Sequence, residues 1–133
     1  MNVIAEIAQE HTKLTEWRRE LHQHPELAFE EHRTAAFVAS KLESFGLQVT
    51  TGIAGTGVVG TLSRGGGNRA IGLRADLDAL PILEANEFEH VSKTPGVMHA
   101  CGHDGHTIML LGAAEYLANH GDFSGTKIGR AHV

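Results

Sequence analysis

The sequence contains a single cysteine, no long apolar run and no excess of positive charge. One cysteine cannot form a disulfide within the chain, so Cys101 is a buried apolar thiol, a reactive thiol or a metal ligand. No apolar stretch reaches the length of a membrane span. The net charge of −5, with acidic and basic residues interspersed, argues against binding to nucleic acid or to an anionic membrane.

The beginning of the chain also lacks the cationic segment of a secretory signal, and it carries an acid within its apolar stretch. We therefore expect a cytoplasmic location. The 133 residues are enough for one domain with a core, and 41% apolar with 20% charged residues is typical of a globular protein. Ten histidines are many for this length, and they favour metal or proton chemistry.

Hydrophobic periodicity divides the chain into helical and extended segments. Apolar residues at helical spacing predict helices, which we place at residues 3–23, 31–45 and from 105 or 106 to about 119. Alternating, β-branched segments predict strands, which we place at residues 47–51, 57–63 and 69–75. The glycine-rich turn at 64–68 suggests that the last two strands form a hairpin, and residues 81–96 are expected to be a loop. This order predicts an α/β fold with a mixed sheet.

The densest group of candidate ligands lies at residues 99–107, which read HACGHDGHT. Thiolate and imidazole groups are preferred ligands of zinc-like ions, and a carboxylate can bridge ions or orient a ligating ring. Cys101 and His103 are two residues apart, so in extended or loop backbone both side chains point to the same side. We interpret this segment as a metal site. The alternative is a buried cysteine beside polar residues that cap a helix.

A second candidate lies at residues 73–81, where Asp76 and Asp78 follow the last predicted strand. Alternation places both carboxylates on one face, at the strand edge where open α/β sheets bind ligands. Two like charges there need a cation, a shared proton or a nearby base. The alternative is a turn before Pro81.

Two further segments are assigned to structure. The polar residues around Pro25, which are His22, Gln23, His24 and Glu26, are typical of one helix ending before another begins. The glycine-rich segment 52–58 matches no nucleotide-binding fingerprint. A thiol enzyme that pairs Cys101 with His103 or His106 is the main rival chemistry, although a glycine-rich segment orients a base poorly.

Three segments, at residues 19–31, 74–81 and 99–107, occur in an order and at separations that resemble the start of an M20-type metallopeptidase of the amidohydrolase branch. That branch includes hippurate hydrolase, N-acyl-amino-acid deacylases and plant auxin-conjugate hydrolases. The resemblance extends to about Thr126. It implies a zinc-peptidase-like α/β/α catalytic domain, interrupted by a smaller dimerisation domain, so a homodimeric parent enzyme. It also implies two divalent ions (Mn, Zn, Co or Ni).

The same resemblance assigns roles to individual residues. Cys101 and His103 correspond to two metal ligands, and Asp78 to the aspartate that orients a metal-binding histidine. In this branch Asp76 occupies the position of that histidine. His106 matches the motif without being a ligand, and His99 receives no metal role. The implied reaction is hydrolysis of a small N-acyl amino acid, in which a glutamate deprotonates a metal-bound water and the metals stabilise the oxyanion.

The glutamate pair and the later histidines of the family are expected after a strand that starts near residues 125–126. We therefore expect residues 1–126 to be the N-terminal portion of the catalytic domain and to be inactive alone. Residues 127–133 resemble the translation of a sequencing adapter and show no clean strand pattern, so we expect a non-native tail. The alternatives are a non-catalytic metal-binding module and a thiol enzyme that uses Cys101.

Overall fold

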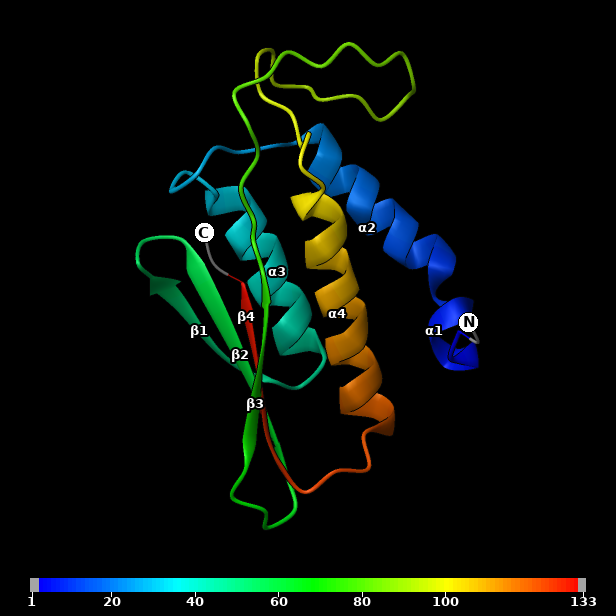
Figure 1. Cartoon of the computed structure of the whole chain (residues 1–133), viewed down its shortest axis with the longest axis vertical. Coiled ribbons are helices and arrows are strands. Elements are labelled where there is room, and N and C mark those ends of the chain that lie inside the picture. The colour runs from blue at the N-terminus through cyan, green and yellow to red at the C-terminus, as the bar shows by residue number, and fades with distance from the viewer. Residues whose placement is uncertain (1–2, 132–133) are drawn as a thin grey trace.

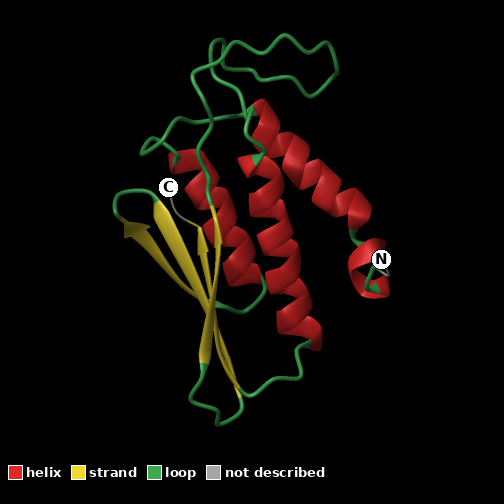
Figure 2. Ribbon diagram, in the orientation of Figure 1, coloured by secondary structure: helices red, strands yellow, loops and turns green. Residues whose placement is uncertain are grey.

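The computed structural model describes residues 3–131, which form a layer of helices against one face of a four-stranded sheet (Figures 1 and 2). Helices α3 and α4 contact the sheet, and α2 packs on α4. The elements in chain order are α1 (Ala5–Gln9), α2 (His11–Gln23), α3 (His32–Ser44), β1 (Gln48–Ile53), β2 (Gly57–Arg64), β3 (Ala70–Ala75), α4 (His103–His120) and β4 (Gly125–Ala131).

The sheet is mixed, as the sequence predicts, and its strand order is β1-β2-β4-β3. Strand β2 pairs antiparallel with both β1 and β4, and β3 pairs parallel with β4. The predicted hairpin between residues 57–63 and 69–75 is therefore wrong, because β4 lies between those two strands. A local turn signal cannot report that a strand from much later in the chain is inserted beside it. The antiparallel neighbours that do follow each other in sequence are β1 and β2.

The strand expected to start near residues 125–126 is present as β4, and it continues to Ala131 although the sequence from residue 127 shows no clean strand pattern. Backbone pairs join Leu62 of β2 to Lys127 and Leu73 of β3 to Gly129, so this segment takes a central place in the sheet. Residues 132–133 lie outside the described residues. The assignment of 127–133 to a non-native tail stays a prediction, since backbone pairing does not distinguish the origin of a strand.

The helix boundaries agree with the periodicity except at two points. Helix α3 ends in a Schellman arrangement, in which Gly46 (φ 83°) donates to Glu43 and Leu47 donates to Leu42, as the glycine predicts. The first predicted helix is split at Glu10, whose φ and ψ of −85° and 2° end α1 before α2 begins. Helix α4 begins at His103, two residues before the earliest predicted start.

The core lies between the sheet and the helices α2, α3 and α4. Its most buried apolar side chains come from these elements and from the segment after β3, and they include Leu21, Val38, Leu42, Val58, Leu77, Ile108 and Leu111. None of the helices within residues 3–131 has the length and apolar character needed to cross a membrane. Leu77 lies between Asp76 and Asp78 in the sequence. Because its side chain is buried in the core, it anchors the polar segment after β3.

Replacing Leu77 by alanine is expected to lower the free energy of unfolding by about 2–5 kcal/mol, because the side chain is 0% exposed and its removal leaves a cavity. Urea denaturation followed by circular dichroism measures the change. The matched control is Leu83→Ala, at a leucine that is 73% exposed, which should change stability by less than about 0.5 kcal/mol. Equal losses in both variants would contradict this account of the core.

Candidate metal centre

The segment 99–107 enters helix α4 from the long connection that follows β3, which extends beyond the sheet in Figure 1. The predicted loop at 81–96 contains no helix or strand in the structure. Its two ends are held together, because Leu80 and Met98 exchange backbone hydrogen bonds of 2.9 and 3.0 Å. This pairing brings the residues that follow β3 beside the residues that precede α4. The two aspartates and the ligand-rich segment, well separated in sequence, therefore meet.

Gly102 sets the point at which helix α4 begins. It is the N-cap residue, with a φ of 96° and a ψ of 13°, a left-handed conformation that glycine adopts at little cost. Its carbonyl accepts the hydrogen bond from the backbone N–H of His106, at 3.0 Å. His103 is consequently in the first helical turn, and Cys101 stays just outside the helix.

The ring of His103 is held by Asp78. Its Nδ1 lies 2.9 Å from Oδ1 of Asp78 and 3.0 Å from the Asp78 backbone carbonyl. A carbonyl and an ionised carboxylate only accept, so Nδ1 is the donor, and in the neutral ring Nε2 then carries the lone pair. A carboxylate or carbonyl behind the ring is the usual partner of a metal-ligating histidine. This geometry fits the roles proposed for Asp78 and His103.

Cys101 is exposed, two residues before His103 and on the solvent side of the helix start. A thiol and an imidazole Nε2 are donors suited to zinc-like ions, so the two residues fit as part of a metal site. Within the described residues, however, no group of three or more His, Cys, Asp or Glu side chains is arranged to hold an ion. Structural and catalytic sites use three or four protein ligands per ion, so the pair does not complete one.

Asp76 takes a different partner from Asp78. Its Oδ1 lies 2.9 Å from Nε and 2.8 Å from Nη2 of Arg74, and its backbone carbonyl accepts a hydrogen bond from Thr107. Burial alternates along residues 75–80, as the predicted extended backbone requires. The expected repulsion between the two carboxylates is relieved separately, by a guanidinium at Asp76 and a histidine N–H at Asp78. No cation shared by both is required.

A buried network that the sequence does not predict lies behind this segment. His22 of α2 is 5% exposed, and its Nδ1 lies 2.8 Å from Oδ2 of Asp104 while its Nε2 lies 2.9 Å from Oε1 of Glu84. The sequence pattern predicts only an ordinary helix end at His22. Spacing rules relate neighbours in sequence, and they give no signal for a pair 82 residues apart.

The other polar residues around Pro25 have the structural role that the sequence predicts. Oε1 of Glu26 accepts hydrogen bonds of 2.6 Å from the backbone N–H and the hydroxyl of Thr34, and its Oε2 accepts one from the N–H of Arg33. These contacts satisfy N–H groups in the first turn of α3. The backbone carbonyl of Gln23 accepts a hydrogen bond from Lys93.

His99 is buried between this network and the ligand pair, and neither of its ring nitrogens has a hydrogen-bond partner among the described residues. Burial lowers the pKa of His99, which favours the neutral ring. The absence of a metal role for His99 stays a prediction.

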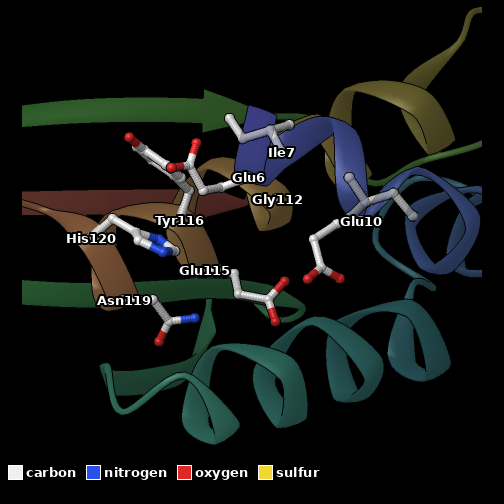
Figure 3. Close-up of a pocket in the computed structure, with 9 residues that line it drawn as sticks. Glu6, Ile7, Glu10, Gly112, Glu115, Tyr116, Asn119 and His120 are labelled. Atoms are coloured by element: carbon white, nitrogen blue, oxygen red, sulfur yellow. The ribbon is translucent and has the colours of Figure 1, made fainter. Parts of the chain in front are cut away.

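The small hollow drawn in Figure 3 lies elsewhere. It has a volume of about 40 Å³ and is lined mainly by α1 and the C-terminal half of α4, including Glu6, Tyr116 and His120. Nearby, Nζ of Lys13 lies 2.6 Å from Glu10 and 2.8 Å from Glu115, so those two carboxylates are paired. This hollow contains none of the candidate ligands, and we assign it no chemistry.

Comparisons with known proteins agree with the geometry. The chain is 50% identical over 125 residues to the hippurate hydrolase of Campylobacter jejuni, covering 94% of this chain and 32% of that protein. It is 54% identical over 104 residues to an N-acyl-L-amino acid amidohydrolase of Geobacillus stearothermophilus, covering 78% and 28%. The profile of Peptidase family M20/M25/M40 matches residues 72–132. The chain belongs to the M20 family.

A solved structure supports the M20 fold. The Bacillus subtilis YXEP protein, described as a dinuclear metal binding peptidase from the M20 family, superposes with a TM-score of 0.85 at 38% identity, covering 93% of this chain and 35% of that one. The predicted family and the α/β fold with a mixed sheet are thus confirmed. The chain spans about a third of the length of the curated relatives it matches.

The low pKa of Glu84 leads to a prediction about acid stability. Burial by itself raises the pKa of Glu84, but hydrogen bonds from Asn86, His22 and Ser92 outweigh it and lower the pKa to about 2, against 4.5 in the unfolded chain. The ionised carboxylate therefore stabilises the fold above about pH 5, and this contribution is lost as the pH falls toward 2. Urea denaturation at a series of pH values should show a steeper acid loss for the wild type than for Glu84→Gln.

The exposed Glu87 of the same loop provides the control, since Glu87→Gln should reproduce the wild-type pH dependence. Parallel curves for the wild type and Glu84→Gln would show that Glu84 is not held as an ion in the folded chain.

Proposed function

We propose that Cys101 and His103 are metal ligands of a metal-dependent amidohydrolase that hydrolyses small N-acyl amino acids to a carboxylate and an amino acid. The observation that carries the proposal is the contact of the Asp78 carboxylate with Nδ1 of His103. The exposed thiol of Cys101 lies two residues before this histidine. This contact leaves Nε2 free to bind an ion. The names of the relatives, hippurate hydrolase and N-acyl-L-amino acid amidohydrolase, support the substrate class.

The metal centre would consist of two divalent ions, chosen from Mn, Zn, Co and Ni, and when bound it would polarise the amide carbonyl and supply the nucleophilic water. In the net reaction the amide C–N bond breaks, the hydroxyl group of water goes to the acyl carbon, and the remaining hydrogen of water goes to the amine nitrogen. Cys101 would bind as a thiolate and His103 through Nε2. Asp78 holds the proton on Nδ1 and fixes the ring, so that Nε2 stays a ligand throughout.

Two ligands do not make a catalytic site, which needs at least three protein ligands per ion and a general base. We therefore expect the 133-residue chain by itself to bind zinc-like ions weakly and to hydrolyse no N-acyl amino acid. The ligand residues are best tested within a chain that completes the site.

A chimera provides that chain: residues 1–126 replace the matched segment of the C. jejuni hippurate hydrolase, and release of glycine from hippurate is measured. We expect an active, metal-containing enzyme. Asp78→Asn should lower kcat/KM by about 10–100-fold through loss of ring orientation, and Cys101→Ser and His103→Asn should lower it further. His120→Asn, at the far end of α4, is the control and should leave the activity unchanged.

The same chimera separates the alternatives. A chelator should abolish activity and added metal should restore it. Full activity in Cys101→Ser and His103→Asn would overturn the proposal. Inactivation by thiol alkylation with no effect of chelation would support a thiol enzyme instead, because a thiol nucleophile needs no metal. Metal binding without turnover would support a non-catalytic module.

A further inference from the structure

The network centred on His22 connects helix α2 to the first turn of α4, directly beside the proposed ligands. Asp104, which follows His103 in the chain, is 0% exposed. Its Oδ2 lies 2.8 Å from Nδ1 of His22 and 3.3 Å from Nε of Arg18. A carboxylate buried this completely keeps its position only while its charge is compensated. The orientation of the first turn of α4 therefore depends on the side chains of His22 and Arg18 of α2.

The opposite side of the His22 ring is held by Glu84. Its Oε1 lies 2.9 Å from Nε2 of His22 and accepts a second hydrogen bond from Asn86, while its Oε2 accepts the backbone N–H of Ser92 at 2.6 Å. Glu84 thereby closes the loop between residues 84 and 92 and fixes it to α2. Carboxylate oxygens therefore lie within hydrogen-bond distance of both ring nitrogens of His22, one from helix α4 and one from the loop.

His22 and Arg18 are the partners of the two carboxylates in this network. The His22 ring lies 2.8 Å from Asp104 and 2.9 Å from Glu84, and the Arg18 guanidinium lies 3.3 Å from Asp104. Removing the His22 ring leaves a buried carboxylate without its closest partner, which is more costly than losing a surface ion pair. The resulting rearrangement falls on the turn that carries His103.

We propose that His22 is a positioning residue of the metal centre, acting through Asp104. This inference rests on the proposed function of Cys101 and His103. His103 is then fixed twice: its ring by Asp78, and its backbone by the contact of the next residue with His22. The first contact sets which nitrogen faces the metal, and the second sets where the helical turn places that nitrogen relative to Cys101.

Two isosteric substitutions divide the network into halves. The amide nitrogen of His22→Asn occupies the place of Nδ1 and keeps a donor for Asp104, whereas that of His22→Gln occupies the place of Nε2 and keeps a donor for Glu84. If His22 acts through Asp104, His22→Gln should weaken metal binding by about tenfold, and His22→Asn should stay close to the wild type. A purely stabilising role would instead make the loss follow the free energy of unfolding.

The experiment is a Co²⁺ titration of the metal-free chimera described above, followed by the thiolate-to-cobalt charge-transfer absorption of Cys101. His24→Gln is the matched control, since His24 lies on the same helix end and its ion-pair contact is to Glu20 within the helix. Urea denaturation of every metal-free variant gives its stability. Asp104→Asn, alone and with His22→Gln, completes a double-mutant cycle, in which the double variant should be no weaker than the single ones.

The expected result is a weaker and altered charge-transfer band in His22→Gln, retained affinity in His22→Asn and an unchanged band in His24→Gln. Wild-type affinity and spectrum in His22→Gln would overturn the positioning role while leaving the ligand assignment intact. Losses that follow unfolding free energy in every variant would also overturn it. A chimera without substitutions that shows no charge-transfer band at saturating Co²⁺ would overturn the ligand assignment, and the inference with it.

Discussion

The hydrogen bond between the Asp78 carboxylate and Nδ1 of His103 joins the end of strand β3 to the beginning of helix α4, and the proposed centre depends on it. Several features of the fold serve this contact. Leu77 anchors the segment after β3 in the core, the backbone pairing of Leu80 with Met98 closes the long connection, and the left-handed Gly102 starts the helix at His103. The carboxylate then determines which ring nitrogen stays available.

Buried charge is the second constraint on this region. Asp104 and Glu84 are taken out of water, and such groups are tolerated only when paired and hydrogen-bonded. The His22 ring contacts both carboxylates, and Arg18 adds a second contact to Asp104. The loop between residues 84 and 92, helix α2 and helix α4 are therefore joined through the imidazole ring of His22. Stability and site geometry share the same contacts here, which is why experiments on His22 must separate affinity from folding.

Local sequence signals predict local structure well in this chain. The glycine at position 46 ends α3 where expected, the three early strands lie within a residue or two of their predicted positions, and Glu26 caps a helix. Errors occur where distant segments decide the outcome. Strand β4 separates β2 from β3, although the glycine-rich turn between them favours a hairpin. Helix α4 begins at His103, earlier than predicted, where its first turn contacts Asp78 of the segment after β3 and His22 of α2.

The sequence by itself determined the chemical character of the site, because the residue types and spacing at residues 99–107, with the aspartates at 76 and 78, predict the family that the comparisons confirm and carry the proposal that Cys101 and His103 are ligands. The tertiary structure alone decided how those groups are held. It separated Asp76, paired with Arg74, from Asp78, paired with His103. It also placed His22 against Asp104. The physical reason is that these contacts join side chains 25 and 82 residues apart, and only the packing of helices on the sheet brings them within hydrogen-bond distance.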